Sequence, residues 1–239
     1  GLDVTDFTAK LSYAPVGSPH AIELKLQLAD QDSNQSYLGL SDADFGNDAL
    51  RRYGLSELDN IATEHEQAIL RYSFDVTANL SVTATAYNNT HQRNWFKTEG
   101  IDLDGSVNAD SFSGSSWASV VDAVNLGKGL GNYTHEELQG ILDGNIDTAA
   151  GSVQLRSNNR EYYSRGLQFG ANWDGSFGGA LHSVSMGLRF HEDEEDRFQR
   201  NDTYSQVAGK LGLDSLGTEG NAGNQVQSAE ALAFYIRDE

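Results

Sequence analysis

The chain has 239 residues, and its 35 acidic residues outnumber 16 basic ones, which gives a formal net charge of −19. This charge argues against nucleic-acid binding, because a protein that binds nucleic acid needs a basic surface. Cysteine is absent, which excludes disulfide and thiolate chemistry, and no apolar run is long enough for a transmembrane helix. The sequence ends at Glu239, within a predicted strand whose alternating apolar residues reach Ile236, so we expect it to be part of a longer protein.

Strict alternation of apolar and polar residues predicts two strands near the start of the chain. Apolar side chains recur at every second position over residues 7–13 and again over residues 22–28. Successive side chains of a strand point to opposite faces, so each predicted strand has one apolar and one polar face. Residues 15–20 contain proline and glycine and are expected to form the turn between these strands.

The same alternation predicts further strands over residues 68–74, 80–87, 163–173, 184–190 and 231–236, and the strand at 80–87 is expected to run on toward residues 94–96. Residues 75–79 and the glycine-rich residues 174–179 are short enough for hairpin turns. Longer polar segments, at about 30–64, 91–159 and up to 227, separate the other strands. In the second of these we expect a short helix over residues 115–124, and another that begins at Thr134, where Thr134 and Glu137 form a capping-box pattern.

Short and long connections therefore alternate along the chain. Compact soluble domains seldom contain repeated long loops without structure of their own, whereas transmembrane β-barrels combine tight turns at one end with long outer loops at the other. Together with the residues that flank these alternating stretches, the predicted strands reach about the 9–11 residues that a spanning strand needs. The predicted fold is all-β: part of an antiparallel transmembrane β-barrel, with about seven strands and with long outer loops that bear short helices.

The charged and aromatic residues favour the same fold. Four charged residues on the polar faces have no obvious partner in the sequence: Glu23, Lys25, Arg71 and Arg189. Each such charge would cost about 2–4 kcal/mol if it faced lipid at mid-depth, so a watery interior suits them better. Four aromatic residues lie near the predicted short turns and suit an interfacial girdle: Tyr13, Phe74, Trp173 and Phe177. The alternative fold is a soluble β-sandwich whose apolar faces pack on each other.

Three groups of residues carry a resemblance to a known family. They are residues 37–45 with 51–53, residues 84–89 with 93–97, and residues 187–199 with Asp202 and Tyr204. In this order they resemble the barrel of TonB-dependent outer-membrane receptors of the ferric-citrate or siderophore type. The resemblance implies a barrel of about 22 strands, with a plug domain inside it and energy delivered by TonB. Residues 1–239 are then part of the barrel domain, and none of them forms the plug.

The resemblance also implies a location and a set of partners. The location is the bacterial outer membrane, and the partners are a ferric chelate, outer-membrane lipid with lipopolysaccharide, and TonB acting through the plug. An anionic chelate needs cationic and hydrogen-bonding side chains. Six residues on the predicted loop side are candidates for ligand binding: Arg51, Arg52, His91, Arg93, Arg197 and Arg200.

The alternative role for each candidate is a structural contact with one of the many nearby carboxylates. The chain as a whole repels anions, so an anion site has to be local. This counts against ferric citrate in particular and leaves neutral and cationic chelates open.

The sequence offers no pattern for a metal site, a cofactor or catalysis. The acidic residues 192–196 lie on alternating faces of a strand, so at most half of them converge on one ion. Residues 102–105 resemble the start of a calcium loop but lack its later glycine and glutamate, and the histidines lack zinc-ligand spacing. The resemblance to TonB-dependent receptors therefore implies a binding and transport segment, not an enzyme. The competing function is that of a secreted β-sandwich, either a carbohydrate-binding module or a hydrolase.

Overall fold

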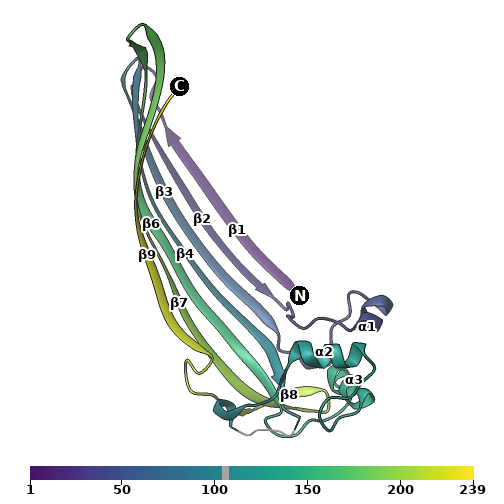
Figure 1. Cartoon of the computed structure of the whole chain (residues 1–239). Helices are drawn as coiled ribbons and strands as arrows, with labels where there is room; N and C mark the ends of the chain where they lie inside the picture. Colours follow the sequence, from purple (N-terminus) through teal and green to yellow (C-terminus); the bar gives the residue numbers. More distant parts are fainter. Residues whose placement is uncertain (104–107) are drawn as a thin grey trace.

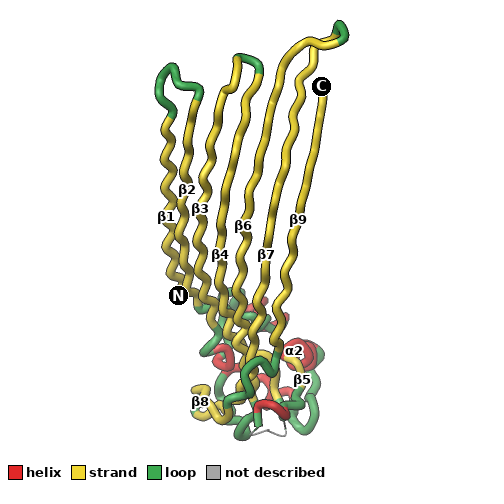
Figure 2. The backbone as a smooth tube through the Cα atoms, turned by 90° about the vertical axis from the view of Figure 1, so that its left-hand side faces the viewer, coloured by secondary structure: helices red, strands yellow, loops and turns green. Residues whose placement is uncertain are grey.

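The structure is a computed structural model that describes residues 1–103 and 108–239. One large antiparallel sheet contains seven long strands: β1 (Leu2–Tyr13), β2 (His20–Ser33), β3 (Asn60–Thr77), β4 (Leu80–Ile101), β6 (Val153–Phe177), β7 (Ala180–Val207) and β9 (Gly223–Asp238). They lie side by side in chain order (Figures 1 and 2). Two short strands join the sheet at its loop end, β5 (Ser115–Ser116) beside β4 and β8 (Lys210–Ser215) beside β7.

The connections are short at one end of the sheet and long at the other. Residues 14–19, 78–79 and 178–179 make the short turns, and residues 34–59, 102–152 and 208–222 connect the strands at the opposite end (Figure 1). Gly178 and Gly179 both have positive φ, 60° and 84°, as a two-residue hairpin turn that matches the twist of its strands requires. The predicted alternation of short and long connections is confirmed.

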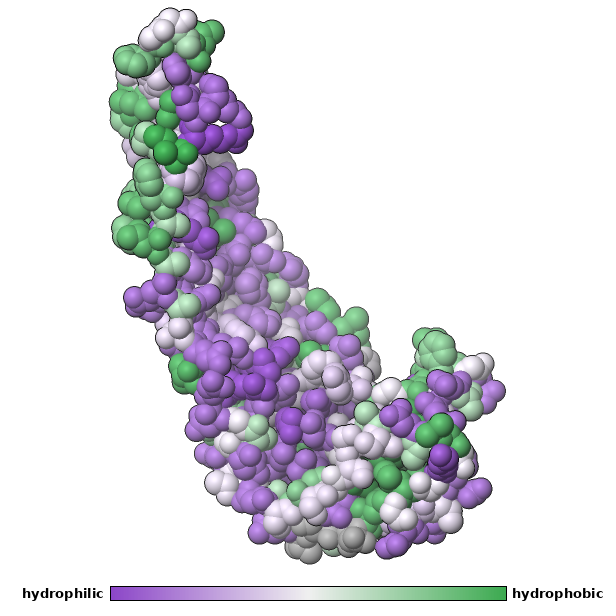
Figure 3. All heavy atoms as spheres, viewed as in Figure 1, coloured by the Kyte–Doolittle hydropathy of each residue, from purple (hydrophilic) through white to green (hydrophobic). Residues whose placement is uncertain are grey.

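Cross-strand register collects the apolar side chains of all seven long strands on one face. One row contains Leu11, Leu24, Leu70, Ala86, Leu167, Phe190 and Leu232. The next row toward the short turns contains Tyr13, Ile22, Tyr72, Ala84, Phe169, Leu188 and Phe234. Figure 3 shows hydrophobic side chains gathered along the convex margin of the upper half of the sheet. We call this the apolar band.

The apolar band is not covered by a second layer. All long strands of the described residues belong to one sheet, and Leu11 and Leu232, at the two edges of the band, remain 65% and 68% exposed. A β-sandwich would bury these rows against each other. The structure therefore confirms part of an antiparallel β-barrel and does not support the sandwich.

The hydrophobic core lies at the loop end. It is built from α2 (Trp117–Asn125), α3 (His135–Asp143), the one-turn helix η1 (Gly54–Ser56) and the adjoining ends of β4 and β6. Its most buried members include Leu55, Val120, Leu138, Leu142 and Leu155, all at 0% exposure. The loops thus pack into a folded unit, while no described residue of the sheet beyond them belongs to this buried core.

Two further short helices complete the loops, α1 (Asp42–Asn47) and η2 (Ala109–Ser111). Both predicted helices are confirmed with small shifts: α2 begins after the N-cap Ser116, and α3 begins after Thr134, whose side chain and that of Glu137 form the expected capping box. No helix among the described residues is long and apolar enough to cross a bilayer. Asp104 and Gly105, part of the rejected calcium loop, lie outside the described residues.

Some predicted boundaries and isolated charges need correction. The strands extend further than predicted, since β4, expected to run on toward residues 94–96, continues to Ile101, and β7 continues to Val207. Beyond the apolar band both faces are polar, which removes the alternation that marks a strand in the sequence. Three of the four charges without an obvious partner do have one: Glu23 pairs with Lys10 at 2.9 Å, Lys25 donates to Gln67 at 2.8 Å, and Arg189 donates to Tyr87 at 3.1 Å.

A pair of substitutions on neighbouring residues of β4 tests the assignment of the two faces. Ala84 lies within the apolar band and Thr83 on the opposite face. In the whole protein refolded into lipid bilayers, Ala84→Arg should lower the free energy of unfolding by about 2–4 kcal/mol, because the charge is forced into hydrocarbon. Thr83→Arg is the control and should change it by less than about 1 kcal/mol. Equal effects of the two substitutions in a denaturant titration would contradict the assignment.

Candidate ligand-binding wall

Three arginines stand side by side on the polar face of the sheet. Arg93 of β4 is the register partner of Arg160 of β6, and Arg160 is the partner of Arg197 of β7. Neighbouring strands lie about 4.8 Å apart, so three positive charges are held within two strand spacings. Like charges directly opposite each other destabilise a sheet. We call these residues the arginine row.

Only the middle arginine has a carboxylate partner among the described residues. Arg160 pairs with Glu195 at 2.9 Å and also contacts Tyr162 Oη at 3.4 Å. The Nε atoms of Arg93 and Arg197 are buried and have no hydrogen-bond partner within the described part of the chain. The row therefore has an excess of positive charge and two unused donors, which suits an anion.

Histidine and tyrosine rings line the polar face next to the arginine row, on the side toward the short turns. His65, His91 and Tyr162 are consecutive register partners on β3, β4 and β6, with ring centroids 6.1 Å and 5.8 Å apart. They border a hollow of about 680 Å³ that Asp193 and Glu195 also line. The two carboxylates make this hollow less favourable for an anion than the arginine row itself.

An aromatic pair lies on the other side of the row, toward the loops. Trp95 is two residues beyond Arg93 on β4, and its Nε1 atom is buried without a partner in the described residues. The ring of Tyr37 meets Trp95 edge-on at 5.1 Å and has Lys97 Nζ 3.9 Å from its centroid. Together these groups provide stacking surface and one more donor beside the row.

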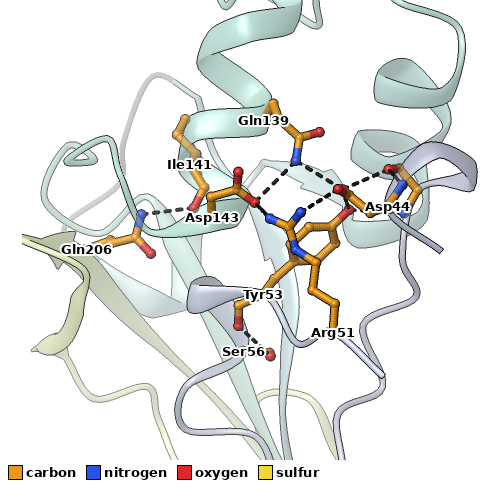
Figure 4. Close-up of polar contacts among 9 residues, drawn as sticks. Asp44, Arg51, Tyr53, Ser56, Gln139, Ile141, Asp143 and Gln206 are labelled. Carbon is orange, nitrogen blue, oxygen red and sulfur yellow. Dashed lines mark hydrogen bonds and ion pairs between the residues drawn. The ribbon is translucent and has the colours of Figure 1, made fainter. Parts of the chain in front are cut away.

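Arg51, one of the six sequence candidates, joins two of the long loops (Figure 4). Its guanidinium binds Asp44, on α1, at 2.5 Å and also Asp143, at the end of α3. Gln139 of α3 donates to both carboxylates, at 3.1 Å and 3.2 Å, and Tyr53 donates to Asp44 at 2.6 Å. We call this set the loop clasp, because it fixes residues 34–59 to α3.

Arg52 and Arg200 also make local contacts. Arg52 donates to the backbone carbonyls of Asn34 at 2.5 Å and Asp59 at 2.7 Å, which closes the loop between β2 and β3. Arg200 pairs with Asp202 at 2.9 Å and projects to the face opposite the arginine row. The structure thus brings His91, Arg93 and Arg197 together and places Arg51, Arg52 and Arg200 elsewhere.

Sequence reasoning missed Arg160, His65, Tyr162 and Trp95. Arg160 lies on the polar face of β6, directly opposite Arg93 of β4. The signal that could have found it was strand pairing. If the predicted strands are extended past the apolar band in the same register, all three arginines fall into one row.

The comparisons with known proteins concern the fold. No protein-family model and no curated protein matches the chain. The ferric citrate transporter FecA in its unliganded form matches 99% of this chain at 17% identity, with a TM-score of 0.60. The ferric-catecholate import receptor Fiu from E. coli K12, in an open form, matches 99% at 13% identity, with a TM-score of 0.55.

The chain spans 27% of the FecA chain and 34% of the Fiu chain. Its fold is that of part of an antiparallel β-barrel like those of these two proteins, one of which is named a transporter and the other an import receptor. The resemblance noted in the sequence is therefore supported at the level of the fold.

Replacement of Arg51 tests the loop clasp. Arg51→Gln should leave Asp44 and Asp143 without their cation, at a cost of about 1–3 kcal/mol in local stability. Hydrogen exchange of the whole protein should then become faster in α1 and α3 and stay unchanged in β3. Lys128→Gln, at an exposed lysine after α2, is the control and should leave exchange unchanged. Unchanged exchange in the Arg51 variant would show that the clasp does not hold the loops together.

The loop clasp should also depend on pH. Burial by itself raises the pKa of Asp44, but hydrogen bonds from Tyr53, Ser41 and Gln139 and the charge of Arg51 together hold it below its usual value. A carboxylate whose pKa is lower in the folded state contributes stability above the unfolded pKa and loses it as the pH falls through the folded pKa. Relative to the rate of an unprotected amide at the same pH, exchange in α1 should therefore stay slow from about pH 7 to 5. This relative rate should rise only below about pH 4. Acceleration already between pH 7 and 5 would contradict this role of Asp44.

Proposed function

We propose that the chain is a segment of the barrel wall of a bacterial outer-membrane receptor that takes up ferric chelates with energy from TonB. The observation that carries the proposal is the division of one sheet into an apolar outer face and a polar inner face with an arginine row. Proteins of the same fold are named for ferric citrate transport and ferric-catecholate import. In this proposal a plug domain from another part of the protein transmits the energy, and lipid with lipopolysaccharide surrounds the apolar band.

The arginine row favours an anionic chelate over a neutral or cationic one. The chain carries a formal charge of −19, so a cluster of three guanidinium groups with one carboxylate partner is a local exception. Ferric citrate and ferric catecholates present several oxygen atoms with negative charge, which planar guanidinium groups bind with two donors each. The overall negative charge of the chain disfavours anionic ligands, but the local positive charge of the arginine row favours them at this place.

Transport by the whole receptor tests the proposal. In cells that lack other iron-chelate receptors, the wild-type protein should bind and import radiolabelled ferric citrate or a ferric tris-catecholate. Arg93→Gln with Arg197→Gln should weaken binding about tenfold or more, because charged hydrogen bonds contribute about 1.5–3 kcal/mol each.

Arg237→Gln is the matched control for this experiment. Arg237 lies at the short-turn end of β9, 68% exposed at its side chain, and pairs with Glu239, two residues further along the chain. Its replacement should leave binding unchanged. A wild-type receptor that binds neither class of chelate, or an Arg93/Arg197 variant with unchanged affinity, would refute the proposal.

A further inference from the structure

A second hollow lies on the polar face near the short turns. It has a volume of about 510 Å³, and Arg71 of β3 and Arg189 of β7 lie on opposite sides of it. Thr85 and Gln168 lie between the two arginines in the same cross-strand row. We call this the inner hollow.

Polar side chains and two glycines line the inner hollow beside the arginines. Gly170 of β6 and Gly187 of β7 are direct register partners in the next cross-strand row toward the short turns. A Cβ atom on Gly170 would lie 2.8 Å from Thr83 Oγ1, and one on Gly187 would lie 2.3 Å from the ring of Tyr235, so the glycines make room for these two side chains. Hydroxyl and amide groups of the lining, such as those of Thr85 and Gln168, can donate to oxygen atoms.

The charge of the inner hollow is positive and lacks a counter-charge. None of the residues that line it is a carboxylate. Arg189 donates to the neutral phenol of Tyr87 and to His191, at 3.1 Å each. Arg71 has no ion pair within residues 1–103 and 108–239, and the carboxylate opposite it, Glu23, is held by Lys10 at 2.9 Å. In a chain with 35 acidic residues, two such guanidinium groups around one hollow indicate an anion site.

The inner hollow is separate from the arginine row. Thr85 and Arg93 are eight residues apart on β4, which is about 26 Å along the strand. The hollow between these two places is lined by Asp193 and Glu195. An anion on this wall therefore has two favourable positions, one toward each end of the sheet, with an acidic stretch between them.

We propose that the inner hollow is a second binding station for the anionic chelate, occupied after the chelate leaves the arginine row on its way to the short-turn end of the barrel. The identity of the ligand rests on the proposed function, whereas the position and charge of the station rest on Arg71, Arg189 and the absence of a carboxylate among the described lining residues. The arginine row captures the ligand, and the inner hollow acts during its passage.

Separate measurements of capture and import test the second station in the whole receptor. The probe is radiolabelled ferric citrate, or a ferric tris-catecholate if that is what the wild-type protein imports. Arg71→Gln with Arg189→Gln should leave the affinity of de-energised cells for the probe within about twofold of wild type. The rate of energised import at saturating probe should fall about tenfold or more. Arg71→Lys with Arg189→Lys keeps the charge and should restore a large part of the import rate.

A further variant distinguishes a loss of ligand binding from misfolding of the arginine variants. Gln168→Glu places a carboxylate directly opposite Arg189, where it forms a favourable ion pair and repels an anionic ligand. It should insert normally, bind the probe normally and import it slowly, whereas Arg237→Gln should behave as wild type. Amounts of folded receptor in the outer membrane normalise all rates.

Three results would overturn the second station. One is unchanged import by both the arginine variant and Gln168→Glu. Another is a loss of capture equal to the loss of import, which would make the inner hollow part of the capture site. A third is new permeability to large antibiotics, which would show that these arginines hold the plug. Failure of the proposed function looks different, because the wild-type receptor itself would then neither bind nor import the chelates.

Discussion

The structure depends on one constraint: in hydrocarbon, every backbone N–H and C=O group must find a partner within the protein. Seven long antiparallel strands meet it by pairing with their neighbours in continuous register. Once the backbone is paired, successive side chains of each strand point alternately to the lipid and to the interior of the barrel. The apolar band, the arginine row and the inner hollow all follow from that assignment. A shift of one residue would exchange the two faces and destroy all three.

Two pairs of tyrosine and glycine bear on this register. Tyr87 is the register partner of Gly166, and Tyr235 is the partner of Gly187. A Cβ atom on Gly166 would lie 2.5 Å from the hydroxyl of Tyr87, and one on Gly187 would lie 2.3 Å from the ring of Tyr235. Each ring therefore needs a glycine as its register partner here, which favours this pairing of β4 with β6 and of β7 with β9.

The sequence predicted those elements that have a local pattern of their own, namely alternating strands and capped helices. Period-two alternation located all seven long strands within the apolar band, and the capping residues Ser116 and Thr134 located two helices. It failed beyond the band, where polar residues occupy both faces of β4 and β7 and the alternation disappears. His91, Arg93 and Arg197 were recognised as cations on the loop side, but the row became visible only when pairing placed Arg160 between two of them. The contacts of Arg51 join residues about ninety positions apart and have no signature in the sequence.

The hydrophobic core lies in the loops, apart from the sheet surface that faces lipid. The buried residues around Leu55, Val120 and Leu138 belong to the loops, and the long strands take no part in the core except at their ends. Insertion into the bilayer and the shape of the exposed tip are thus governed by different sets of residues. In the proposed outer-membrane receptor, a substitution in the tip leaves the contacts between the wall and lipid unchanged, and a substitution in the apolar band leaves the core of the tip unchanged. The tip can therefore be replaced or extended without altering the part of the sheet that faces lipid.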